Sequence, residues 1–177
     1  MCALTGTHPP PPAAADAAGD LLAGAFEQHA PALHRYLAAR VGRDVAAEIV
    51  ADTFARAFRE RARFDPERGT LRGWLYGIAE NGLRTHRRSE HRRLRALGRL
   101  EAEWTPAHAT ADPAATAFLH AIARLDAGDR ELILLLAWGE LSYEEIAQAT
   151  GRTHAAVRSR LARIRAGLRD ALAKEVS

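Results

Sequence analysis

The sequence predicts an all-α protein built of two small helical domains joined by a linker, the C-terminal one a helix-turn-helix. Three observations support this prediction. Apolar residues recur at helical spacing from Asp20 onward, and no segment shows the alternating pattern of a half-buried strand. A proline-containing stretch near the middle has no amphipathic period. A chain of 177 residues is also long enough for two small domains.

The composition excludes several classes of protein. The one cysteine, Cys2, rules out an internal disulfide and a cysteine-based zinc site within one chain, and it fits a reducing cytoplasm. No apolar run reaches the roughly 18 residues that span a bilayer. The N-terminus lacks the basic and then apolar segments of a signal peptide. We therefore expect a cytoplasmic protein without membrane insertion.

The basic charge is concentrated in two segments. Lys174 is the single lysine, so 24 of the 25 basic residues are arginines. Residues 84–99 and 152–169 each carry a net charge of +6, which leaves −9 for the rest of the chain. This segregation indicates two separate surfaces that face polyanions. The alternative is an arginine-rich composition whose charged faces are merely solvated.

The first segments are a tail and a long helix. Residues 1–19 are rich in Pro, Ala and Gly, and their composition predicts a disordered tail. A helix follows from Asp20 to Val41, and Pro31 is expected to break or kink it. Gly42 is expected to end it. Its apolar positions are Leu22, Phe26, Leu33, Leu37 and Val41.

The second helix is expected over residues 44–61, with Asp44 as its N-cap. Its polar face carries Glu48, Asp52 and Arg59. The opposite, apolar stripe consists of Val45, Ile49, Val50, Thr53, Phe54, Ala57 and Phe58.

The third helix follows a turn at residues 65–69 and is expected over residues 70–88, with residues 92–99 compatible with an extension. Gly73, Gly77 and Gly82 each weaken an isolated helix by roughly 1 kcal/mol relative to Ala. Their spacing instead favours close contact with another helix. A loop and aromatic residues beside an arginine-rich helix are typical of surfaces that capture unstacked nucleic acid.

The chain therefore divides into four segments. Residues 1–19 form the tail and residues 20–99 the first domain. Residues 100–113 form a linker in which Trp104 is a candidate anchor. Residues 114–177 form the second domain.

The second domain contains the signature of a helix-turn-helix. Ser142 and Glu145 form an S-x-x-E capping box at the start of a short helix. Gly151 is placed to end that helix, and Thr153 is placed to cap the next one. A short helix, a glycine-containing turn and a basic helix are the parts of a DNA-binding helix-turn-helix.

The second of these helices has two distinct faces. Small residues, Ala155, Ser159 and Ala162, lie opposite the apolar stripe, and arginines flank them. Such a face can enter a major groove while the arginines reach phosphates or guanine edges. The stripe consists of Val157, Leu161, Ile164, Leu168 and Leu172, and the arginines are Arg158, Arg160 and Arg163.

No pattern in the chain indicates catalysis, a cofactor or a metal site. The pairs His29/His34 and His86/His91 are each five residues apart, which does not place both rings on one helix face. No glycine-rich phosphate loop, nucleophile elbow or acid/base pair is present. We therefore expect a protein that is not an enzyme.

Residues 46–58, 63–81 and 141–172 together resemble RNA polymerase sigma factors of the sigma-70 family, of the extracytoplasmic-function (ECF) type. The resemblance implies a promoter-specificity subunit. In it the N-terminal domain binds the clamp of the β′ subunit of core RNA polymerase and opens the −10 promoter element, and the C-terminal domain recognises the −35 element as duplex. It also implies an anti-sigma partner. The alternatives are a stand-alone helix-turn-helix regulator, a nucleic-acid-processing enzyme and a protein–protein adaptor.

The resemblance also implies roles for individual residues. Trp74 is expected to be structural, and Ala47 and Ala51 stand where family members often have an acid and Gln. The clamp-binding candidates are Glu48, Asp52, Arg56 and Arg59. The candidates for the −10 element and its backbone are Phe64, with the loop 65–70, Asn81, Arg84, Arg87 and Arg88. The candidates for the −35 element are Thr153, His154, Ala155, Arg158, Ser159, Arg160 and Arg163.

Overall fold

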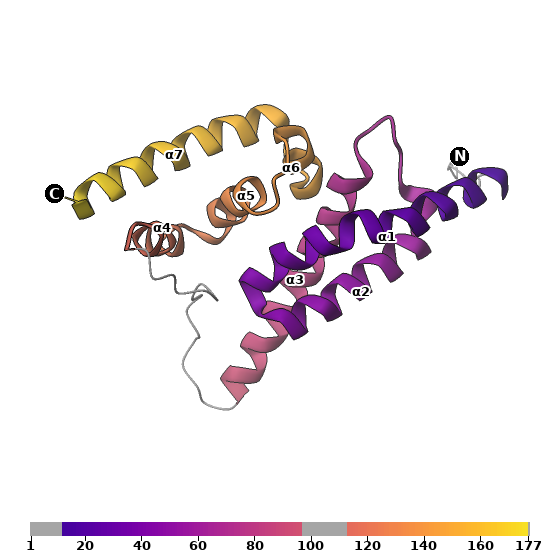
Figure 1. Ribbon diagram of the computed structural model, residues 1–177, viewed down its shortest axis with the longest axis horizontal. Helices are drawn as coiled ribbons and strands as arrows, with labels where there is room; N and C mark the ends of the chain where they lie inside the picture. The colour runs from indigo at the N-terminus through magenta and orange to yellow at the C-terminus, as the bar shows by residue number, and fades with distance from the viewer. Residues whose placement is uncertain (1–11, 97–112, 177) are drawn as a thin grey trace, which may run out of the picture.

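The computed structural model describes residues 12–96 and 113–176, and the side chains of residues 24–96 and 116–173. Within these ranges every regular element is a helix, which agrees with the predicted all-α fold (Figure 1). Helices α1 to α3 form one group and α4 to α7 the other. Trp104 and most of the expected linker lie outside the described residues.

The first helix, α1, spans Pro12–Val41 and differs from the prediction at two points. It begins inside the segment 1–19 that the composition assigns to a disordered tail. It also continues through Pro31, which costs an interior helix about 3 kcal/mol. Ala30 and Leu33 on either side are buried, and this packing explains why the helix persists. Phe26, one of the apolar positions of the expected helix, is 49% exposed and meets Phe54 edge-to-face.

Helix α2 spans Arg43–Arg59, and a short 3₁₀ turn, η1, follows at Arg61–Arg63. The N-cap of α2 is Gly42 rather than the predicted Asp44. Gly42 has φ +84°, a conformation that glycine adopts without steric cost, and it lets the chain reverse directly from α1 into α2. Asp44 lies in the first turn instead, where a negative charge favours the helix dipole.

Helix α3 runs unbroken over Leu71–Ala96, so the expected helix and its extension form one element. It packs on α1 and α2 through Ala79 and Leu83, which are fully buried. Its buried Glu80 carboxylate accepts a hydrogen bond from the Tyr36 hydroxyl at 2.5 Å and pairs with the Arg40 guanidinium. A charge pair buried in this way joins α1 to α3 at the centre of the first domain.

The second domain comprises α4 (Pro113–Ala123), α5 (Ala127–Ala137), α6 (Tyr143–Thr150) and α7 (His154–Val176). Asp126 caps α5 by accepting a hydrogen bond from the Asp129 amide at 2.9 Å. Arg130 donates to the carbonyl groups of Ile122, Ala123 and Leu125 at and beyond the end of α4. These contacts set the position of α4 against α5.

The two helical groups touch along α3 and α6, which lie side by side in Figure 1. The hydrophobic core is continuous across this boundary. It contains Tyr36 and Leu83 from the first group, and Leu132, Leu141 and Ile146 from the second. The described helices therefore form a closed arrangement of two domains.

Candidate nucleic-acid interface

The helix-turn-helix is built by local hydrogen bonds that the sequence predicts. The Ser142 hydroxyl accepts from the Glu145 amide at 3.1 Å, and the Glu145 carboxylate accepts from the Ser142 amide at 2.9 Å. Gly151 ends α6 in the left-handed conformation with φ +66°. The Thr153 hydroxyl accepts from the Ala156 amide at 3.2 Å and caps α7. The capping box, the glycine turn and the second cap are all confirmed.

The two faces of α7 also follow the prediction. Val157, Leu161, Ile164 and Leu168 are buried against α4, α5 and α6, and Leu172 is half-buried. The small residues of the opposite face are exposed, and so are Arg158 and Arg163. Neither arginine makes a side-chain hydrogen bond or ion pair with another described residue. The exposed positions on this surface are Thr153, His154, Ala155, Arg158, Ser159, Ala162 and Arg163.

Arg160 is placed differently from the other two arginines. Its guanidinium pairs with Asp126 at 2.9 Å and also with Asp129, both at the start of α5. These bonds connect the middle of α7 to the cap of α5. No local pattern predicts these bonds, because the partners are 34 and 31 residues away in the sequence.

The loop between η1 and α3 forms the candidate single-strand site. The Phe64 ring packs on Trp74 with centroids 5.4 Å apart, and Trp74 lies against the small cluster of Ala57, Leu75 and Ile78. The half-buried Trp74 thus occupies the structural position expected for it. Asp65 stabilises the turn by accepting a hydrogen bond from the Glu67 amide at 3.0 Å.

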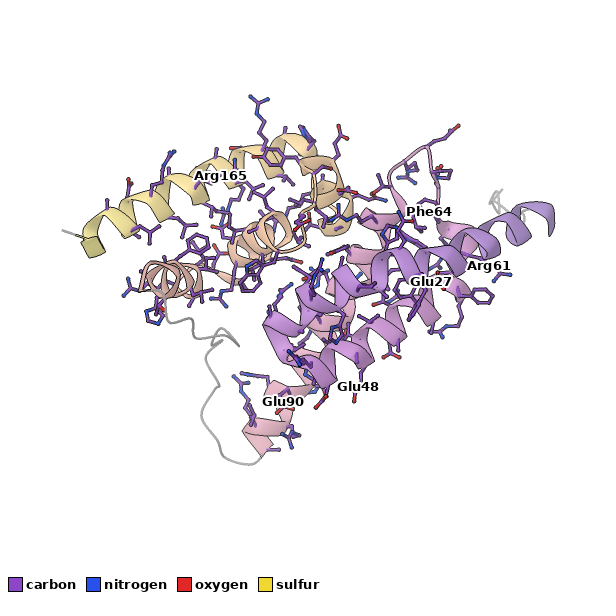
Figure 2. The ribbon with its side chains drawn as sticks, in the orientation of Figure 1. Glu27, Glu48, Arg61, Phe64, Glu90 and Arg165 are labelled. Carbon is purple, nitrogen blue, oxygen red and sulfur yellow. The ribbon has the colours of Figure 1, made fainter. Side chains whose placement is uncertain are left out.

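This loop forms one wall of a cleft of about 470 Å³, and the helix-turn-helix forms the other. Phe64, Asp65 and Arg68 line the first wall. The second wall consists of Glu144, Ala147, Gln148, Gly151, Arg152 and His154. In Figure 2, Phe64 lies on the side of the first domain that faces α6. One candidate from each predicted nucleic-acid surface, Phe64 and His154, therefore lines this cleft.

The polar residues of α3 are engaged as well. Arg84 donates from Nη2 to the Asn81 side-chain oxygen at 2.7 Å, and from Nη1 to Glu131 of α5 at 3.1 Å. Arg87 is partly buried, and burial together with the nearby Arg40 lowers its pKa. Its buried Nη2 atom has no hydrogen-bond partner among the described residues. Arg88 is exposed.

The exposed face of α2 carries the remaining candidates. Glu48, Asp52 and Arg59 are exposed, and Arg56 pairs with Glu60 at 2.9 Å. All four candidates line a cleft of about 440 Å³ between α2 and α3, which also contains Asn81. In Figure 2, Glu48 lies on α2, away from α6.

Beside this face, α1 and α2 form an apolar groove of about 520 Å³. Ala47 and Ala51 belong to its lining, together with Val50 and Phe26. Phe26 and Phe58 are the large apolar side chains that remain exposed among the described residues. This side of the domain therefore combines an acidic strip with accessible apolar surface.

Two further findings concern the described part of the chain. No group of three or more His, Cys, Asp or Glu side chains is arranged to hold a metal ion there. No helix in these ranges has both the length and the apolar character needed to cross a membrane.

Comparison with known proteins agrees with this architecture. Residues 25–93 match the family described as Sigma-70 region 2, and residues 115–168 match Sigma-70, region 4. The sequence is 32% identical over 162 residues to the RNA polymerase sigma factor CarQ of Myxococcus xanthus, covering 89% of this chain and 92% of CarQ. It is 30% identical over 152 residues to the ECF RNA polymerase sigma factor BldN of Streptomyces coelicolor, covering 82% of this chain and only 56% of BldN.

Two solved structures are similar over most of the chain. CnrH in complex with the cytosolic domain of CnrY has a TM-score of 0.62 and 26% identity, with 93% of this chain and 94% of that one covered. The sigma factor RpoE of Bartonella quintana, in complex with the anti-sigma factor NepR, has a TM-score of 0.65 and 25% identity, with 86% and 97% covered.

Proposed function

The chain belongs to the ECF-type sigma factors of the sigma-70 family, non-enzymatic subunits that promote transcription initiation by RNA polymerase, and from this premise we propose a separate task for each of its three candidate surfaces. The first domain contains region 2 and the second contains region 4. The match to both regions favours a sigma factor over a stand-alone helix-turn-helix regulator.

The exposed face of α7 recognises the −35 element as duplex. Its small side chains permit close approach to base edges, and Arg158 and Arg163 are free to reach guanine or phosphate. The other members of this surface are Thr153, His154, Ala155 and Ser159. Arg160 contributes chiefly by holding α7 in place, since its guanidinium is already paired with two aspartates.

The loop at Phe64 and the adjoining face of α3 capture the opened −10 element. The Phe64 ring, packed on the structural Trp74, offers a stacking surface, and the Asn81 amide on α3 offers hydrogen bonds. These are the two kinds of contact that an unstacked base requires. Arg84, Arg87 and Arg88 then bind the adjacent backbone. This coexistence of a stacking loop with a duplex-binding helix is the observation that best supports promoter opening.

The face of α2 binds the clamp of the β′ subunit of core polymerase. Glu48 and Asp52 are exposed and available to basic partners, while Arg56 and Arg59 lie on the same cleft. Ala47 and Ala51 give the neighbouring groove an apolar lining, so this contact is more apolar than in relatives with an acid and Gln there.

We also infer an anti-sigma partner, and activity in the cytoplasm where RNA polymerase acts. The support is that two similar structures contain such complexes: RpoE with the anti-sigma factor NepR, and CnrH with the cytosolic domain of CnrY. A partner that covers region 2 or region 4 would withhold the chain from polymerase.

Reconstitution with core RNA polymerase tests this function. Purified chain plus core enzyme is expected to start transcription from a subset of genomic fragments, whereas core enzyme alone does not. Permanganate footprinting should detect a melted bubble, and Asn81→Ala should reduce the bubble while leaving retention on core polymerase unchanged. Identical footprints for this variant and the wild-type chain would remove Asn81 from the −10 site.

A further inference from the structure

We propose that the cleft between the loop at Phe64 and the helix-turn-helix binds a free nucleoside polyphosphate, a small-molecule ligand separate from promoter DNA. Its base stacks on region 2, and its phosphates lie between arginines of both regions. The proposal goes beyond the proposed function. It rests on that function only where Phe64 is assigned to the −10 strand, because the nucleotide and the strand then compete for one ring.

The cleft has a suitable size and a fixed shape. Its volume is about 470 Å³, within the range of about 300–1,000 Å³ that is usual for small-molecule sites. The Thr70 amide donates to Oε1 of Gln148 at 3.1 Å, and Nε2 of Gln148 donates back to the Thr70 carbonyl at 3.1 Å. The Thr70 hydroxyl donates to Glu145 at 3.0 Å. These bonds hold the loop end on α6, so the spacing of the two walls is defined in the folded chain.

Glycines on α3 bring the walls close together. Gly73 and Gly77 lie one turn apart and face α6. A Cβ atom on Gly77 would lie 3.3 Å from both Cα and O of Ala149. Backbone atoms cannot yield as a flexible side chain can. A larger residue at position 77 would therefore move α6, and with it the second wall, away from the loop.

The first wall offers an aromatic surface for a base. The Phe64 ring packs on Trp74 with centroids 5.4 Å apart, so Trp74 supports it from behind. Both side chains belong to the lining of the cleft. Stacking on such a ring is open to every base, because each base has a π-face. This wall therefore favours a ligand with a planar ring but does not select one base.

Cationic side chains come from both walls. Arg63 and Arg68 belong to the side of η1 and the loop, and Arg152 and His154 to the side of the helix-turn-helix. Arg63 is paired with Glu60 at 3.2 Å. Arg68 and Arg152 are exposed, and neither side chain makes a hydrogen bond or ion pair with another described residue. A guanidinium binds phosphate through two parallel hydrogen bonds, so this pair suits a chain of phosphates that reaches from one wall to the other.

Two carboxylates distinguish a nucleotide from a simple anion. Asp65 on the loop and Glu144 on α6 also line the cleft. Asp65 uses Oδ1 to accept from the Glu67 amide, and Glu144 is exposed. Carboxylates repel inorganic phosphate, but they accept hydrogen bonds from ribose hydroxyls and base amino groups. The mixed lining therefore fits a ligand that joins phosphates to a sugar and a base.

The contribution of region 4 separates this ligand from a flipped promoter base. The proposed capture of the −10 element uses the loop and α3, which both belong to region 2. A nucleotide that also contacts Arg152 needs both walls at their present spacing. It therefore binds the arrangement of domains described above and not separated domains, and by linkage it stabilises that arrangement.

Calorimetric titration of the whole chain with GTP, ATP, guanosine and inorganic pyrophosphate tests the proposal. GTP and ATP should each bind at least about tenfold more tightly than guanosine or pyrophosphate, since only the nucleotides combine stacking with charged hydrogen bonds. Arg68→Ala and Arg152→Ala should each weaken GTP binding by about tenfold, because each removes a charged hydrogen-bonding partner. Arg169→Ala, exposed on α7, is the control and should leave it unchanged.

Two results in this series would overturn the proposal. One is wild-type affinity for GTP in Arg152→Ala, which would confine any nucleotide to region 2. The other is pyrophosphate binding as tight as GTP binding, which would indicate attraction by charge alone.

A wedge between the walls distinguishes a free nucleotide from a DNA base. Gly77→Leu should weaken GTP binding by about tenfold, because apparent affinity scales with the fraction of molecules that hold both walls in place. Binding of a fluorescent single strand of random sequence should not weaken. Leucine favours a helix over glycine, so α3 should stay folded. The matched control is Gly24→Leu on α1, where an added Cβ meets nothing within 4 Å.

The two ligands also separate the two possible failures. A wild-type chain that binds the single strand but neither GTP nor ATP would overturn the nucleotide site and leave the −10 assignment in place. A chain that binds GTP but not the strand would support the nucleotide site and count against the −10 assignment. Where both bind, excess GTP should displace the strand; simultaneous binding without competition would contradict the shared use of Phe64.

Discussion

The two arginine-rich segments carry the same net charge in the sequence but differ in the structure. On α7, Arg158 and Arg163 extend into solvent without an ion pair among the described residues. On α3, Arg84 is bonded to Glu131 and Arg87 is partly buried, although Arg88 and Arg92 stay exposed. Equal charge therefore does not mean equal availability. Arg158 and Arg163 of region 4 are available to a partner, whereas Arg84 of region 2 takes part in the contact between domains.

The largest effect should come from the buried charge pair beneath this contact. Arg40→Met leaves the Glu80 carboxylate buried without its partner, which should lower the free energy of unfolding by about 3–5 kcal/mol. Arg163→Met, at an exposed position, should change it by less than about 0.5 kcal/mol. Urea unfolding measures both. The double variant Arg40→Met/Glu80→Leu should be more stable than Arg40→Met alone; equal stability would show that the charge left by Arg40→Met is not the cause.

The next effect concerns the exposed arginines. Arg158→Ala should weaken binding of the holoenzyme to duplex containing the −35 element by about tenfold, as expected when one base-edge or phosphate contact is lost. Arg169→Ala, exposed about three turns further along α7, is the matched control and should have little effect. Affinity titrations at several salt concentrations measure both variants. Unchanged affinity for Arg158→Ala across that series would remove it from the recognition surface.

A smaller effect is the dependence of the domain contact on pH. Burial and the neighbouring Glu80 carboxylate raise the pKa of Glu131 to about 7, although Arg84 and Arg40 act in the opposite direction. In the separated state Glu131 regains an ordinary pKa near 4.5, so the closed state binds more protons between these values. The closed state should therefore be favoured at pH 6 and weakened as the pH rises through about 7.

Fluorescence energy transfer between labels on α2 and α7 measures this shift from pH 6 to pH 8. Glu131→Gln should flatten the profile, because the amide does not titrate. Glu27→Gln, on the exposed side of α1, should leave the profile unchanged. An unaltered profile in Glu131→Gln would assign the pH dependence to another group.

The smallest effect should appear in the salt dependence of single-strand binding. Arg84→Ala removes one phosphate contact from the open state, so the slope of log affinity against log salt should decrease by about 0.7. Arg35→Ala, exposed on α1, is the control and should leave the slope unchanged. Loss of the half-exposed pair with Glu131 should shift stability by less than about 1 kcal/mol. An unchanged slope would limit Arg84 to the domain contact.

Local patterns in the sequence predicted local structure well. Ser142 with Glu145, Gly151 and Thr153 each act within four residues, and the structure confirms all three features. The continuation of α1 through Pro31 could not be predicted, because it depends on packing against α2. Contacts between residues far apart in the sequence could not be predicted either.

The candidate site shows the same limit. The glycine spacing on α3 predicted close contact with a helix, but nothing in it specified α6 as the partner. The pairing of Arg160 with Asp126 and Asp129 joins positions more than 30 residues apart, so its sequence position alone placed Arg160 with the predicted DNA-binding arginines. Burial of Arg87 has the same origin, because α1 and α5 lie near it only in the folded chain.

The two oxygens of the Glu145 carboxylate accept hydrogen bonds from two different domains. Oε2 accepts from the Ser142 amide and begins α6, while Oε1 accepts from the Thr70 hydroxyl of region 2. Selection then acts on position 145 for two separate reasons, the capping box of α6 and the contact with Thr70. Homologues that keep the closed arrangement should show paired changes at positions 70 and 145. Homologues that have lost it should retain only the capping box, and position 70 should drift freely among them.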